Sequence, residues 1–90
     1  EVVGFAGPPY KDDYDTTRVT GYVDNFSAEE LASVTVEVQL LNDSGERMEL
    51  VTFDVEDIGP GNRKTFDVSA GTLAGPRTAE ITIVSAEVYE

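Results

Sequence analysis

The sequence predicts an all-β fold: an antiparallel β-sandwich of six to seven strands, formed by a single domain that spans residues 1–90. Three observations lead to this fold class. Apolar and polar residues alternate with a period of two along most of the chain, as in strands with one buried face. Turn-forming residues separate the alternating runs at short intervals. No segment has the length and periodicity of a helix, and residues 27–31 allow one helical turn at most. A small β-barrel is the alternative architecture.

The alternating runs place the strands in chain order. A short first strand is expected at residues 2–5, followed by a strand at 19–24. The clearest strand covers residues 34–40, because Val34, Val36, Val38 and Leu40 alternate with polar side chains. Further strands are expected at residues 48–56, 65–68 and 79–88.

Two of these runs change phase, so their apolar residues switch from odd to even positions or the reverse. Such a switch moves the apolar side chains to the other face unless an extra residue absorbs it. We therefore expect one β-bulge near Leu50-Val51 and a second near Ile83-Val84. A strand that bends from one sheet to the other is the alternative explanation.

Four segments are expected to connect the strands. Gly45 closes a hairpin turn at residues 42–45, and Pro60 with Gly61 forms a second turn at 59–62. A third turn is expected at Ala74-Gly75-Pro76. Residues 7–15 form a long polar connection, which we expect to be the most mobile segment of the chain.

The charge balance narrows the classes of partner. Eighteen acidic residues face six basic ones, which gives a net charge of −12. Nucleic acid is excluded as a partner because phosphates require a basic surface, and direct contact with an anionic membrane is disfavoured for the same reason. A surface rich in acids and poor in lysine resembles the surfaces of haloarchaeal proteins, so we expect adaptation to high salt.

The residue types that most enzymes depend on are missing. The chain has no histidine and no cysteine, which removes the commonest general base, the commonest metal ligands and any disulfide. No phosphate-binding glycine loop is present, and a domain of this size has little room for a desolvated pocket. We therefore expect no enzymatic activity and no cofactor.

Two kinds of candidate site remain. Asp12, Asp13 and Asp15 cluster in one loop, where several oxygens could ligate Ca²⁺, although a solvated acidic surface is the simpler explanation of this cluster. Asn25 and Asn42 each begin an Asn-X-Ser sequon in an expected turn, which makes both candidate glycosylation sites or simply turn-forming residues.

Three segments together resemble the FxLYD domain, an immunoglobulin-like module of prokaryotic envelope and secreted proteins. Residues 19–25 fit the V-x-G-x-V-x-N strand of that family, and residues 38–45 lie at its naming motif, with Val38, Leu41 and Asn42 in place of Phe, Tyr and Asp. Residues 58–61 with Phe66 match its proline-glycine turn and following strand. The motif positions of this chain are Gly21, Asn25, Leu40, Gly45, Pro60, Gly61 and Phe66.

The resemblance implies an immunoglobulin-like sandwich that acts as a non-catalytic structural or protein-interaction module. A carbohydrate- or calcium-binding accessory module is the alternative function. A protein partner would bind through a sheet edge or the loops. Because the chain starts at Glu1 rather than methionine, we expect a fragment of an extracellular or cell-envelope protein, anchored through a segment not present here.

Overall fold

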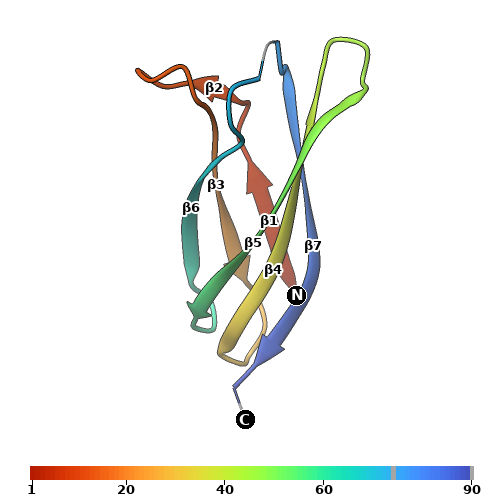
Figure 1. Ribbon diagram of the computed structural model, residues 1–90. Helices are drawn as coiled ribbons and strands as arrows, with labels where there is room; N and C mark the ends of the chain where they lie inside the picture. Colours follow the sequence, from red (N-terminus) through yellow and green to blue (C-terminus); the bar gives the residue numbers. More distant parts are fainter. Residues whose placement is uncertain (74, 90) are drawn as a thin grey trace.

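The computed structural model describes residues 1–73 and 75–89, and it consists of two antiparallel sheets packed face to face (Figure 1). The all-β, sandwich-like fold expected from the sequence is therefore confirmed. Sheet 1 holds β3 (Thr17–Asn25) at its centre, with β1 (Val2–Ala6) and the short β2 (Tyr10–Lys11) along one side and β6 (Arg63–Ser69) along the other. Sheet 2 has the order β5-β4-β7, formed by Arg47–Ile58, Leu31–Leu41 and Thr78–Val88.

The core lies between β3 and β4. Val34, Val36, Val38 and Leu40 are fully buried, as their alternation predicts. They pack against Val19 and Val23 of β3 and against the inward residues of β5. Full burial of one such side chain contributes roughly 1.5–3 kcal/mol, so β4 provides the largest share of the apolar stabilisation.

The bulge expected near Ile83-Val84 is confirmed. Val36 pairs with Ile83 and the preceding Thr35 pairs with Ser85, so Val84 is the extra residue. Val84 is 51% exposed, and the shift returns Ala86 to the inner face opposite Val34.

The bulge expected near Leu50-Val51 is wrong in its position. Gln39 and Val38 pair with Leu50 and Val51 without interruption, and the register shifts two residues earlier, where Met48 is the extra residue. The phase change has a simpler cause, because Leu50 lies on the outer face of the sheet and is 37% exposed.

Residues 7–15 are more regular than the sequence suggested. Tyr10 and Lys11 form β2, which pairs with Arg18 and Thr17 at the start of β3, so the expected irregular connection is wrong at these two residues. A two-residue strand is too short to show alternation. The turn expected at residues 74–76 includes Ala74, which lies outside the described residues.

The molecule is elongated, with extents of 42 × 26 × 17 Å. The hairpin from β2 to β3, the hairpin from β4 to β5 and the segment before β7 lie at one end, called here the upper end (Figure 1). The N-terminus, the end of β7 and the turn between β5 and β6 lie toward the opposite, lower end (Figure 1). Within the described part of the chain, no helix has the length and apolarity needed to cross a bilayer.

Candidate functional site

Asn25 lies at the lower end, where β3 stops. Its side chain is fully buried and makes four hydrogen bonds. Nδ2 donates to the carbonyl oxygens of Glu29, at 2.8 Å, and Ile58, at 3.0 Å. Oδ1 accepts from the backbone N–H of Ser27, at 2.9 Å, and from its hydroxyl group, at 2.6 Å. The side chain thus joins β3, the loop that follows it and the end of β5, which is a structural role.

Asn25 is also held through its backbone. Its N–H donates to the carbonyl of Asn62 at 2.9 Å, and its own carbonyl accepts from the N–H of Gly61 at 2.8 Å. Pro60 and Gly61 occupy the central positions of a turn closed by the N–H of Asn62 and the carbonyl of Gly59. The positive φ of 73° at Gly61 is the conformation that a type II turn requires there.

Gly21 allows three chain segments to approach closely. It pairs with Ala6 on one side and Phe66 on the other. A Cβ atom at this position would clash with the carbonyl oxygen of Phe5 and would lie 2.6 Å from Cζ of Phe66. Phe66 itself packs against Phe53 of sheet 2, with ring centroids 4.9 Å apart. Gly21 and Phe66 therefore belong to the packing of the sandwich.

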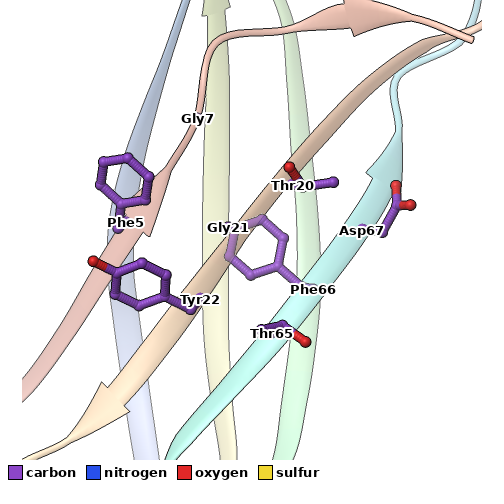
Figure 2. A pocket seen from close by; sticks show the side chains of 8 residues that line it. All are labelled: Phe5, Gly7, Thr20, Gly21, Tyr22, Thr65, Phe66 and Asp67. Atoms are coloured by element: carbon purple, nitrogen blue, oxygen red, sulfur yellow. The ribbon is translucent and has the colours of Figure 1, made fainter.

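A shallow groove of about 620 Å³ runs over the outer side of sheet 1 beside Gly21 (Figure 2). Phe5, 50% exposed, stacks on Tyr22 with ring centroids 5.2 Å apart. The guanidinium group of Arg63 lies 3.7 Å from the ring centroid of Tyr22. Thr20 and Asp67 supply polar groups at the rim. The groove offers an aromatic surface with neighbouring hydroxyl and carboxylate groups.

The sequence gives only a weak indication of this groove. The parity of Tyr22, opposite to that of Val19 and Val23, indicates an outward ring. Its partner Phe5 belongs to the least regular expected strand, and the register that brings the two rings together comes from long-range pairing.

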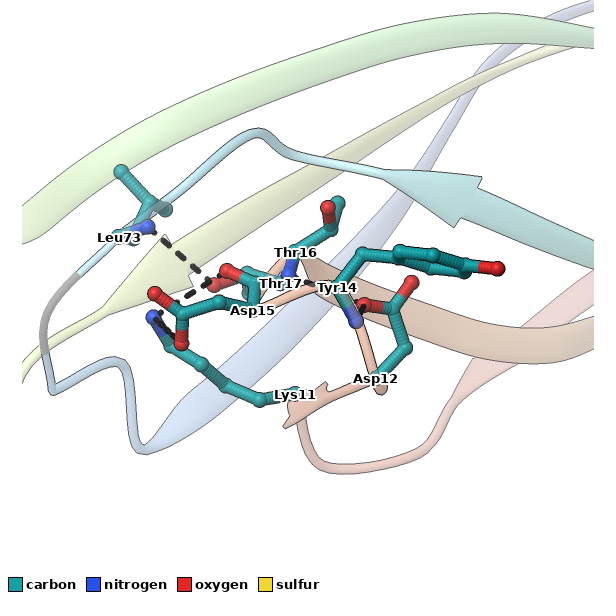
Figure 3. A network of polar contacts seen from close by, with 7 residues as sticks. All are labelled: Lys11, Asp12, Tyr14, Asp15, Thr16, Thr17 and Leu73. Carbon is teal, nitrogen blue, oxygen red and sulfur yellow. Dashed lines mark hydrogen bonds and ion pairs between the residues drawn. The ribbon is translucent and has the colours of Figure 1, made fainter.

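The candidate metal ligands lie in a hydrogen-bonded turn at residues 12–16, called here the Asp12 loop (Figure 3). Oδ1 of Asp12 accepts from the backbone N–H groups of Tyr14, at 2.9 Å, and Thr16, at 3.0 Å. Asp15 has a positive φ of 63° and pairs with Lys11 at 3.1 Å. The exposed Asp13 lies between these two residues.

The surroundings of Asp12 perturb its carboxyl group. The hydrogen bond from the Thr16 N–H is the largest cause holding the pKa of Asp12 below its ordinary value of 3.8. Partial desolvation opposes this shift, and the Tyr14 N–H and the charge of Arg18 add to it. Among the residues that the structure describes, no three acidic side chains gather as a metal site would require.

The second candidate sequon lies in an equivalent turn at residues 42–46, called here the Asn42 loop. Oδ1 of Asn42 accepts from the N–H groups of Ser44, at 2.9 Å, and Glu46, at 3.0 Å. Gly45 has a positive φ of 80°, at the position that Asp15 occupies in the Asp12 loop. In both loops the N–H of the fourth residue donates to the carbonyl of the first. One side-chain oxygen therefore organises each loop in the same way.

Charge is divided unequally between the two sheets. The strands of sheet 2 carry seven acidic residues and one basic residue, Arg47; the acids are Glu37, Glu49, Asp54, Glu56, Asp57, Glu80 and Glu87. The strands of sheet 1 carry four basic and two acidic residues, namely Lys11, Arg18, Arg63, Lys64, Asp24 and Asp67. Arg18 pairs with Asp67 at 2.9 Å, and Arg63 pairs with Asp24 at 2.7 Å. Sheet 2 is therefore the source of a strongly negative surface.

Exposed apolar residues on the strands are concentrated where β1 lies beside β7 (Figure 1). Val3 and Phe5 of β1 are 39% and 50% exposed, and Val84 and Val88 of β7 are 51% and 44% exposed. The opposite margin, formed by β5 and β6, shows one comparable residue, Leu50. The two open margins of the sandwich therefore differ in their apolar character.

Comparison with known proteins assigns no relatives: no family model matches the chain, and no curated protein or solved structure matches it significantly.

Proposed function

We propose that this domain is a non-catalytic protein-interaction module within an exported or membrane-anchored protein. The observation that carries the proposal is the open margin formed by β1 and β7, which combines exposed apolar residues with unpaired strand edges. Unpaired strands can bind an extended segment of a partner through backbone hydrogen bonds. The lack of histidine and cysteine in the chain supports a role without catalysis.

We assign the sandwich to the immunoglobulin-like, FxLYD-type architecture. Its sheet orders, β1-β3-β6 and β5-β4-β7, fit the orders A-B-E and C′-C-F of immunoglobulin-like domains. The motif residues Gly21, Asn25, Pro60 and Phe66 hold the strands and turns of this framework. The acidic composition fits an origin in a halophilic prokaryote and an extracellular or cell-envelope location.

A photo-crosslinking experiment tests the interaction role. Benzoylphenylalanine is placed at Thr82 or Val84 on β7, and separately at Thr52 on β5 and Thr65 on β6, in the organism that makes the protein. We expect a discrete crosslinked protein from the β7 positions. If none of the four positions gives a crosslinked protein, the domain is not an interaction module.

Carbohydrate binding is the second candidate function, and the groove on sheet 1 favours it. Sugar rings stack on exposed aromatic faces, and Phe5 offers such a face beside Thr20 and Asp67. Titration of a panel of oligosaccharides against the native chain and the Phe5→Ala variant tests this function. Heat of binding that disappears in Phe5→Ala supports it, and no heat from any glycan at millimolar concentration rejects it.

A further inference from the structure

β7 is an open edge of sheet 2. Among residues 1–73 and 75–89 it pairs with β4 alone, and between Thr78 and Ile83 the register with β4 is unbroken. In an antiparallel strand, alternate residues direct their N–H and C=O groups to opposite sides. About half of the backbone groups between Thr78 and Ile83 therefore point away from β4, along a stretch of roughly 20 Å.

The side chains of this edge differ between its two faces. Ala79, Ile81 and Ile83 point inward and are only partly buried, and the apolar residues beyond the bulge, Val84 and Val88, are more exposed. On β5, the other edge of sheet 2, Val51 and Phe53 are likewise partly buried, and Val55 and Ile58 are 6% and 1% exposed. The two edges therefore differ beyond the bulge, where β7 exposes Val84 and Val88 while β5 buries Val55 and Ile58.

The outer face of the same edge is acidic. Glu80 and Glu87 lie on the outer face of β7, and Glu37 lies on the neighbouring β4. Neither β4 nor β7 contains a lysine or an arginine. Segments with acidic outward residues are repelled by this surface, whereas basic residues are attracted to it.

We propose that the β7 edge between Thr78 and Ile83 binds an extended partner segment in which apolar and basic residues alternate. This inference rests on the proposed interaction role and specifies the chemistry of the partner. The segment adds as an antiparallel strand, like every other strand pair in the described molecule. Its apolar residues extend the inner face beside Ile81 and Ile83, and its basic residues lie on the outer face near Glu80.

A synthetic peptide provides the test. The probe is the heptapeptide Lys-Val-Lys-Val-Lys-Val-Lys, titrated against the native chain by fluorescence anisotropy at low salt. Two controls have the same charge: the block sequence Val-Val-Val-Lys-Lys-Lys-Lys, and the alternating peptide with N-methyl groups on alternate amides. We expect the alternating peptide to bind at least about tenfold more tightly than either control, because only it has both the alternation and the backbone donors.

Matched variants locate the binding site. Glu80→Lys/Glu87→Lys reverses two charges on β7, and Glu49→Lys/Glu56→Lys changes the net charge equally on β5. We expect the β7 variant to bind the peptide roughly tenfold more weakly and the β5 variant to bind it nearly as well as the native chain. Amide hydrogen exchange of the native chain should slow within Thr78–Ile83 when peptide is added.

Three results overturn the proposal. Equal binding of the alternating, block and N-methylated peptides shows attraction by net charge alone. Slower amide hydrogen exchange on β5 or β6, with no change on β7, shows that the peptide adds to a different edge. If the β7 variant does not fold, the proposal is tested on the native chain alone. The two measurements are then the binding of the N-methylated peptide and the pattern of amide hydrogen exchange. A crosslinked partner at β7 combined with no binding of the peptide rejects the partner chemistry but leaves the interaction role intact.

Discussion

At the scale of single residues, Asn25 makes the most extensive polar contacts. Its bonds to Ser27 and Glu29 are local, as is usual for an asparagine in a turn. The bond to the carbonyl of Ile58 spans 33 residues of sequence, and local sequence patterns carry no information about such a contact.

Replacing Asn25 with alanine should destabilise the fold by about 2–4 kcal/mol, because the buried carbonyl of Ile58 loses its donor and a cavity forms. Chemical unfolding of the variant measures the loss. Ser27→Ala removes only the hydroxyl bonds and should cost about 1 kcal/mol. Equal losses for the two variants would show that the bonds of Nδ2 contribute nothing.

Gly21→Ala should destabilise the fold by about 2–4 kcal/mol, because the new methyl group meets the carbonyl of Phe5 and the ring of Phe66. Gly7→Ala is the matched control, since its Cβ would lie 3.5 Å from the carbonyl of Thr20, an ordinary contact. The second variant Gly21→Ala/Phe66→Leu should recover only part of the loss, because the backbone contact remains. Full recovery in thermal unfolding would locate the constraint in Phe66 alone.

At the scale of elements, alternation predicted the long strands well and the short features poorly. β4 shows four fully buried residues at every second position, which is a strong local signal. The bulge lies at Met48 and not at the predicted Leu50-Val51. The prediction was wrong because Leu50 faces outward, and an apolar residue on the outer face breaks the alternation in the same way as a bulge does. β2 was missed because its pairing with Arg18 and Thr17 comes from the closed Asp12 loop rather than from a pattern of its own.

The Asp12 loop should make stability depend on pH. The folded pKa of Asp12 lies below its ordinary value of 3.8, so its contribution is present in full above that value. The contribution is lost as pH falls through the folded pKa. Asp12→Asn keeps the acceptor oxygen, as Asn42 does in its own loop, and removes the titration.

Unfolding free energies of the native chain and of Asp12→Asn, measured from pH 7 to pH 2, check this expectation. Relative to Asp12→Asn, the native chain should become less stable as pH falls below about 4. Asp13→Asn makes the same charge change on the neighbouring exposed residue and serves as the control. If the unfolding free energies of the native chain and of Asp12→Asn differ by the same amount at every pH, the carboxylate of Asp12 has no special role in the loop.

At the scale of the whole molecule, the net charge of −12 was evident from the sequence, but its distribution was not. The division between a basic, aromatic sheet 1 and an acidic sheet 2 depends on which strands pair. Sequence order mixes the two sheets, because β3 is followed by β4 and β5, and β6 by β7. The sequence patterns also do not show that β1 and β7 form an open margin, because this too depends on which strands pair.

Molar KCl should stabilise the fold by screening the repulsion among the acids of sheet 2. A gain of about 1 kcal/mol raises the thermal midpoint of a domain this size by roughly 4–8 °C. Glu37→Gln/Glu80→Gln removes two of these acids and should reduce the gain. Equal midpoints at low and molar KCl would argue strongly against adaptation to high salt.

The burial of Asn25 sets the folding of this chain against its glycosylation. Asn25 is the acceptor residue of the sequon Asn25-Phe26-Ser27, and both hydrogens of its Nδ2 are donated inside the fold. Attachment of an oligosaccharide replaces one of those hydrogens with a bulky group that the closed lower end has no space for. In a compartment that contains a glycosyltransferase, folding and modification therefore compete for one nitrogen atom. Chains that fold first protect Asn25, and chains modified first cannot close this end of the sandwich.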